Sequence, residues 1–160
     1  MIRIAETFGF HLVSLDVRQE SSSHTRAVSE ILRPAGDVEY EKLDENQRLA
    51  LLAKQIESGT RPEFDKSQLD QENHQTLEVF ETIREMREQI GQRCIGSYVI
   101  SMTHCASHIM DVMYLGFAAG LAGRHWGDVD CSLDIAPLVV PVEGLGHLVV
   151  VLDSVVLHKG

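Results

Sequence analysis

Asp16 and Arg18 are the first residues whose types and spacing could support chemistry. They lie at the end of a segment whose apolar side chains alternate as on a strand. Side chains two residues apart on a strand point to the same face, so Asp16 and Arg18 would share a face. They would lie at the carboxyl end of that strand, where α/β enzymes place their polar working groups. An arginine there offers a planar fork of donors to a phosphate or a carboxylate. The same spacing fits a structural ion pair of Arg18 with Asp16 or Glu20, so both interpretations stay open.

A second candidate is the pair His104 and His108, which lie four residues apart and flank Cys105. This spacing suggests a metal site, but the zinc-protease pattern needs a glutamate where Cys105 stands, and no further ligand pair has suitable spacing. We therefore expect capping and packing roles, with a metal-binding module as an alternative. Cys94, Cys105 and Cys131 lack flanking acid–base pairs and are interpreted as buried small apolar residues.

Composition excludes several classes of protein. The chain has 160 residues, 44% of them hydrophobic, which predicts one domain with a real core. Its 24 acidic and 14 basic residues give a net charge of −10, which argues against a nucleic-acid partner. No apolar run reaches the roughly 20 residues of a membrane span, and no signal pattern is visible. The odd number of cysteines fits a reduced, cytoplasmic protein.

The elements that must position these residues follow from hydrophobic periodicity. The elements come in the order strand, three helices, strand, helix, strand and a final ambiguous segment. This order predicts a helix-rich α/β fold with about three parallel strands and crossover helices. The expected strands are residues 10–17, 95–102 and 133–140. The expected helices are residues 22–34, 44–59, 77–91 and Ser107–Ala119, and residues 145–157 fit a helix or a strand.

Three sequence blocks resemble one known family. They read ETFGFHLVSLDVRQESSSH (residues 6–24), RCIGSYVISMTHCASHIMDVMYL (residues 93–115) and LDIAPL (residues 133–138). Their content, order and spacing resemble the phosphoenolpyruvate carboxylase family. The matches cover essentially the whole chain, and together they are far more specific than any single motif.

The resemblance implies a cytoplasmic enzyme that forms oxaloacetate and phosphate from phosphoenolpyruvate and bicarbonate, with Mg²⁺ or Mn²⁺. In the family the substrate phosphate passes to bicarbonate, and the enolate of pyruvate then attacks carbon dioxide. Arg18 matches the arginine of the family's RQES motif, which implies a catalytic role at the end of a barrel strand. Residues 1–160 would form a single partial (β/α) barrel domain, and the complete protein would be a homo-oligomer.

Two departures from the family lead us to expect a chain that is inactive alone. The family continues after LDI-x-PL as F-E-T, whose glutamate is a metal ligand, but Val140 stands at that position here and cannot coordinate magnesium. Glu143 is out of register by three. Family members are also several times longer, and a barrel needs eight strands in about 250 residues. We therefore expect no metal bound by this chain, and a non-catalytic α/β remnant with a structural or interaction role is the alternative.

Overall fold

The computed structural model describes residues 14–33, 39–125, 128–131 and 133–139. Five strands and four α-helices lie in these ranges, with short 3₁₀ turns between them. They are β1 (Leu15–Glu20), α2 (Ser21–Leu32), α3 (Glu45–Glu57), α4 (Gln71–Gln89), β2 (Ile95–Thr103), α5 (Ser107–Ala119), β3 (Ala122–His125), β4 (Asp128–Cys131) and β5 (Asp134–Val139).

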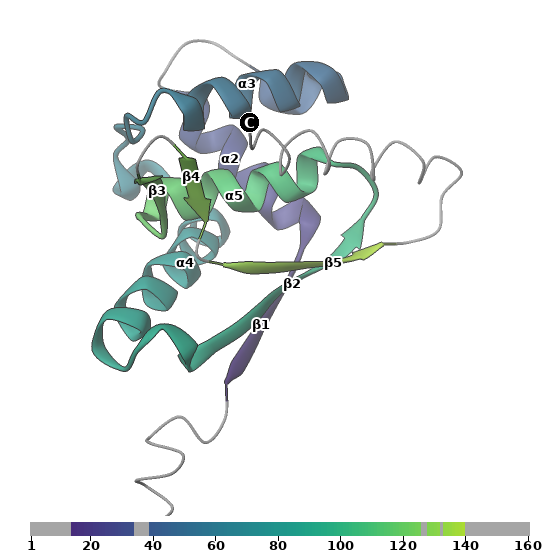
Figure 1. Ribbon diagram of the computed structural model, residues 1–160. Coiled ribbons are helices and arrows are strands. Elements are labelled where there is room, and N and C mark those ends of the chain that lie inside the picture. Colours follow the sequence, from purple (N-terminus) through teal and green to yellow (C-terminus); the bar gives the residue numbers. More distant parts are fainter. Residues whose placement is uncertain (1–13, 34–38, 126–127, 132, 140–160) are drawn as a thin grey trace, which may run out of the picture.

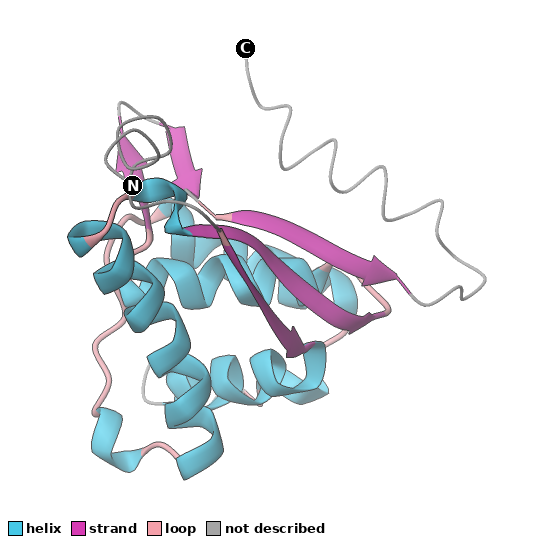
Figure 2. Ribbon diagram, turned by 90° about the horizontal axis from the view of Figure 1, so that it is seen from below, coloured by secondary structure: helices cyan, strands magenta, loops and turns pink. Residues whose placement is uncertain are grey.

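The main sheet has the order β1-β2-β5, and all its strands are parallel. The helices lie on one face of this sheet, and α3 lies farthest from it against α5 (Figures 1 and 2). The expected α/β class with three parallel strands and helical crossovers is therefore confirmed. The opposite face of the sheet is not covered by any described helix.

Two strand predictions differ from the structure. The first strand, β1, extends beyond the expected end at Val17, because its ladder with β2 continues through Arg18, opposite Val99, and Glu20, opposite Ser101. Residues 10–13 of the expected strand lie outside the described residues. The expected third strand is β5, and Val140 lies outside the described residues. The predicted element at 145–157 also lies outside them. The antiparallel pair of β3 and β4 was not expected.

Local signals account for several helix ends. Asp44 and Gln47 form a capping box at the start of α3, with N to O distances of 2.9 and 3.1 Å. Helix α5 ends at Gly120, whose φ of 86° suits glycine. Helix α4 begins at Gln71, six residues before the expected start, because its first turns are polar and carry no apolar periodicity.

The core lies between the sheet and helices α2, α4 and α5. Tyr98 of β2 is fully buried, and its ring stacks on that of Phe80 in α4 at a centroid distance of 4.9 Å. Tyr114 and Ile100 are also fully buried. The remaining core consists mainly of aliphatic side chains from the same three helices.

A buried carboxylate joins three elements within this core. Asp111 of α5 is fully buried and accepts hydrogen bonds from the Tyr40 hydroxyl at 2.6 Å and the Thr25 hydroxyl at 2.7 Å. Burial raises the pKa of Asp111 to about 6. The fully buried His24 behaves in the opposite direction, because burial lowers its pKa to about 4.

These opposite shifts predict a specific effect of Asp111→Asn on pH-dependent stability. Folded Asp111 holds its proton more tightly than the unfolded chain, so this residue lowers stability as pH rises from about 4 to about 6. The depressed pKa of His24 raises stability with pH between about 4 and 6.5, and the two effects offset each other. In Asp111→Asn only the effect of His24 remains. The free energy of unfolding in urea should then gain on the order of 2 kcal/mol, relative to wild type, between pH 4.5 and 6.5.

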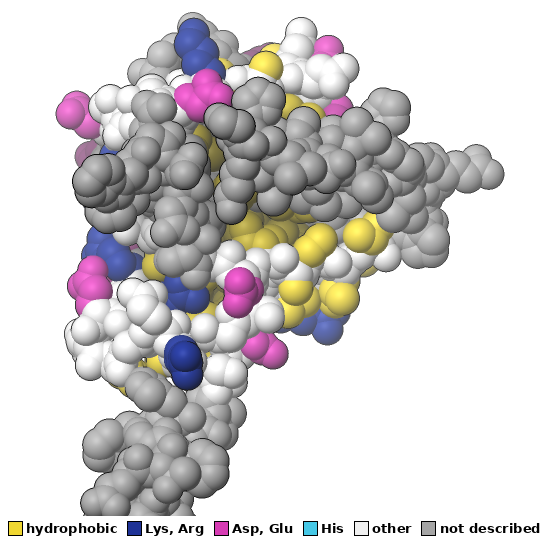
Figure 3. Space-filling view, in the orientation of Figure 1, with side chains coloured by type: hydrophobic (Ala, Val, Ile, Leu, Met, Phe, Trp, Pro, Cys, Tyr) yellow, Lys and Arg dark blue, Asp and Glu magenta, His cyan; other side chains and the backbone are white. Residues whose placement is uncertain are grey.

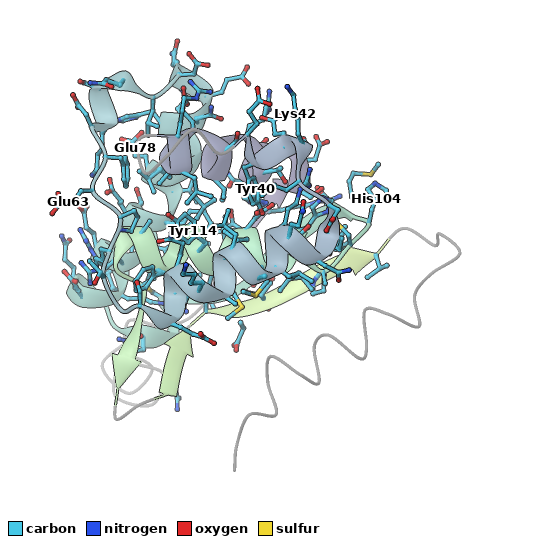
Figure 4. The ribbon with its side chains drawn as sticks, turned by 90° about the horizontal axis from the view of Figure 1, so that it is seen from above. Tyr40, Lys42, Glu63, Glu78, His104 and Tyr114 are labelled. Carbon is cyan, nitrogen blue, oxygen red and sulfur yellow. The ribbon has the colours of Figure 1, made fainter. Side chains whose placement is uncertain are left out.

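The exposed Glu63→Gln is the matched control, because it removes a carboxylate that lies away from Tyr40, the partner of Asp111 (Figure 4). Its pH dependence should follow that of the wild type. Parallel curves for Asp111→Asn and wild type would contradict the assignment of a raised pKa to Asp111.

Candidate functional site

Arg18 lies on the open face of the sheet, near the carboxyl end of β1. Side chains alternate along this strand, so Asp16, Arg18 and Glu20 are exposed while Val17 and Gln19 are half-buried toward the helices. Asp16 and Arg18 are both exposed, but Asp16 also lines a groove toward α4 that Arg18 does not reach. That the two share a face stays a prediction. Across the sheet Arg18 is opposite Val99, which leaves apolar surface rather than a counter-charge beside it.

The two carboxylates that could pair with Arg18 have other partners. Asp16 accepts a hydrogen bond from the backbone N–H of Ser97 at 2.8 Å, where the register of β1 and β2 shifts. Glu20 accepts from the Ser22 hydroxyl at 3.0 Å. Arg18 forms no ion pair with either, so within the described residues the structural alternative is not realised. Its guanidinium donors remain available to a ligand, and its catalytic role stays a prediction.

The carboxyl edge of β2 contains an unusual backbone conformation. Met102 has a φ of 57°, a left-handed conformation that costs a non-glycine residue of order 1–3 kcal/mol. The Ser21 hydroxyl donates to the Met102 carbonyl at 2.7 Å and helps to hold this conformation. The Met102 side chain is 48% exposed, and Leu138 of β5 is 47% exposed. Hydrophobic side chains gather on this part of the surface (Figure 3).

Beneath the sheet, a hydrogen-bonded chain connects β1 to β2 and α2. The Tyr98 hydroxyl donates to Gln19 Oε1 at 2.5 Å and lies 2.8 Å from His24 Nε2. Sequence reasoning missed this chain, since it treated His24 as one of several scattered histidines. Its only local signal is a polar Gln19 and a tyrosine at strand positions that face the helices.

His104 and His108 lie at the turn between β2 and α5, where His104 is exposed (Figure 4). The backbone N–H of His104 donates to His108 Nδ1 at 3.3 Å, so Nδ1 accepts a hydrogen bond from the backbone just before α5. Glu45 of α3 accepts from the backbone N–H of Ser107 at 2.8 Å and from its hydroxyl at 2.6 Å, and thereby caps α5. At this turn His108 accepts one backbone hydrogen bond, and the residue that caps α5 is Glu45, not either histidine.

The described residues contain no group of three or more His, Cys, Asp or Glu side chains placed to hold a metal ion. Cys94 is buried, as expected. Cys105 is half-buried and lies 3.3 Å from the Ser107 hydroxyl, and burial raises the pKa of its thiol. The side chain of Cys131 lies outside the described part of the structure.

A groove of about 550 Å³ lies between β1 and α4, at the amino-terminal end of the strand. Its lining is mainly apolar, including Leu15, Val79 and Met86, with Asp16 and Glu78 at its polar positions. Because Arg18 does not line this groove, the groove and the candidate anion site are separate features.

None of the described helices is long and apolar enough to cross a membrane.

Comparison with known proteins gives consistent results along the whole chain. The family model for phosphoenolpyruvate carboxylase matches residues 1–159. The phosphoenolpyruvate carboxylase of Rhodothermus marinus is 38% identical over 99% of this chain and 18% of its own length. That of Burkholderia vietnamiensis is 36% identical over 89% of this chain and 14% of its own length. That of Parasynechococcus marenigrum is 35% identical over 92% of this chain, again 14% of its own length.

The chain thus spans less than a fifth of the length of these relatives. The match nevertheless includes the RQES segment with Arg18, the strand β2 and the segment of β5. The chain belongs to the phosphoenolpyruvate carboxylase family.

Proposed function

We propose that this chain supplies part of a phosphoenolpyruvate carboxylase and contributes Arg18 as a binding group for the anionic substrate. The proposed reaction converts phosphoenolpyruvate and bicarbonate into oxaloacetate and phosphate. The family membership over residues 1–159 supports it, and the single structural observation that carries it is Arg18 on the open sheet face, where it forms no ion pair with any described residue. We further propose that the three parallel strands belong to a larger (β/α) barrel in a cytoplasmic homo-oligomer.

The chemistry of this reaction favours an arginine at this position. Phosphate transfer and enolate formation place negative charge on oxygens, and fixed cationic donors stabilise such charge. A guanidinium keeps its charge at neutral pH and can donate two parallel hydrogen bonds to a phosphate or a carboxylate. The parallel strands bring their carboxyl ends to one edge, which leaves Arg18 and the exposed Met102 near the same end of the sheet.

The divalent metal of the family does not fit the described residues, because none of their acidic or histidine side chains form a three-ligand group. Val140 stands where the family has a metal-binding glutamate. We therefore propose that Mg²⁺ or Mn²⁺ is held by residues of the longer protein outside this chain. None of the roles assigned to residues of this chain depends on the metal.

The chain alone should not carboxylate phosphoenolpyruvate. Purified protein with bicarbonate and Mg²⁺ should form no oxaloacetate above background in an assay coupled to oxaloacetate reduction. Val140→Glu should not restore activity, because one ligand cannot assemble a site whose other groups are missing. Oxaloacetate formation by the wild-type chain would refute the proposal that the site is completed elsewhere.

The binding role of Arg18 can be tested in this chain without turnover. We expect the Nε resonance of Arg18 in ¹⁵N-labelled protein to shift on titration with phosphoenolpyruvate, at constant ionic strength. A single charge-assisted contact gives weak affinity, with a Kd of roughly ten millimolar or more. Arg18→Lys should weaken the binding further, because the charge stays but the planar fork is lost.

Arg93 provides an internal control in the same sample, because it is exposed at the amino-terminal end of β2, away from the carboxyl edge. Its resonance should not shift. Equal responses of Arg18 and Arg93, or of phosphoenolpyruvate and sodium sulfate, would reject specific binding at Arg18. That result would favour the alternative of a non-catalytic structural or interaction module.

A further inference from the structure

The end of β1 that contains Arg18 is held mainly from one side. Among the described residues β1 pairs only with β2, so its other edge has no ladder there. Near Arg18 this pairing is supplemented by the Ser101 hydroxyl, which donates to the Gln19 carbonyl at 3.2 Å. An edge strand held on one side opens more easily than a central one, so additional contacts near its end affect where its side chains point.

The hydrogen-bonded chain beneath the sheet supplies such a contact. Gln19 follows Arg18 directly, and its side chain lies on the opposite face of the strand. The Tyr98 hydroxyl reaches the Oε1 atom of Gln19 at 2.5 Å. Tyr98 is itself immobilised, because it is fully buried and its ring stacks on Phe80.

The direction of these hydrogen bonds is determined by the available protons. An amide oxygen can only accept, so the single proton of the Tyr98 hydroxyl goes to Gln19. His24 Nε2 must then donate to the Tyr98 oxygen, which needs only the neutral imidazole. Burial favours that neutral form, because it lowers the pKa of His24 to about 4. His24 thus orients Tyr98, and Tyr98 orients Gln19.

We propose that Tyr98 is a positioning residue for Arg18, acting through its hydroxyl group and the side chain of Gln19. The proposal rests on the proposed function, since it assigns Arg18 the role of an anion-binding group. With residue 19 fixed on the helix side, the Cα–Cβ bond of residue 18 points to the open face in one direction. The buried hydrogen bond therefore presets the site on the opposite face of the same strand.

Tyr98→Phe tests the proposal, because it removes the hydroxyl and keeps the stacked ring. The amide hydrogens of β1 that bond to β2 near Arg18 should exchange roughly tenfold faster relative to that of Ile100 in β2. The Kd for phosphoenolpyruvate, measured from the Arg18 resonance, should weaken about three- to tenfold. A general loss of stability would accelerate exchange at Ile100 as well, so the ratio separates local loosening from global unfolding.

Tyr114→Phe is the matched control. The Tyr114 hydroxyl is buried and has no hydrogen-bond partner in the described structure, so its removal breaks no such bond. This variant should leave both the exchange ratio and the affinity of the wild type unchanged. If it changes them as much as Tyr98→Phe does, the proposal is overturned, because the effect would not depend on the bond to Gln19.

Two further results would also overturn the proposal. One is an unchanged exchange ratio in Tyr98→Phe. The other is a changed exchange ratio with an unchanged affinity for phosphoenolpyruvate, because the hydrogen bond between Tyr98 and Gln19 would then have a structural role only. If wild-type protein does not bind phosphoenolpyruvate, the proposed function fails, and the exchange ratio alone decides whether Tyr98 orders Arg18. If Tyr98→Phe does not fold, Gln19→Met removes the acceptor from the half-buried partner and is judged by the same criteria.

Discussion

Parallel pairing of β2 with β1 on one side and β5 on the other is the constraint on which the rest of the structure depends. β2 is the central strand of the described sheet, and its helix-facing side chains Tyr98 and Ile100 are fully buried. A shift of register by one residue would move them to the open face, so the pairing and the core specify each other. Helices α2, α4 and α5 then pack on the surface that β2 presents.

The core that results contains two polar centres of opposite character. Asp111 accepts from Tyr40 and Thr25, and so connects α5 to the turn before α3 and to α2. His24 remains neutral and connects α2 to the sheet through Tyr98. Both are buried groups whose hydrogen bonds compensate for much of the cost of removing them from water. These contacts give the helix layer a specific arrangement that apolar packing alone specifies less sharply.

The described helices all lie on one face of the sheet, so the hydrogen bonds that hold β1 lie on the covered face and the proposed binding group lies on the open one. Residues on the covered face, such as Gln19 and Tyr98, hold the strands together. Residues on the open face, such as Arg18, have no counter-charge among the described residues. The chain spans less than a fifth of the length of its relatives, and the open face carries Arg18, the proposed anion-binding group.

The sequence by itself determined the features that depend on neighbouring residues. Alternating and helical periodicities predicted the three strands of the main sheet and the four helices, because such periodicity arises within a few residues. The family was also evident from three ordered motifs. The start of α4 and the pair β3 and β4 were missed, because polar first turns and short strands carry weak periodicity.

Only the tertiary structure decided which partners the polar groups have. Asp16 bonds to Ser97, 81 positions away, instead of pairing with Arg18, and Tyr98 lies 79 positions from Gln19. The capping of α5 by Glu45 and the left-handed conformation of Met102 likewise have no local signal. Such contacts depend on how the strands register and how the helices pack on them, and periodicity along the chain does not encode that choice.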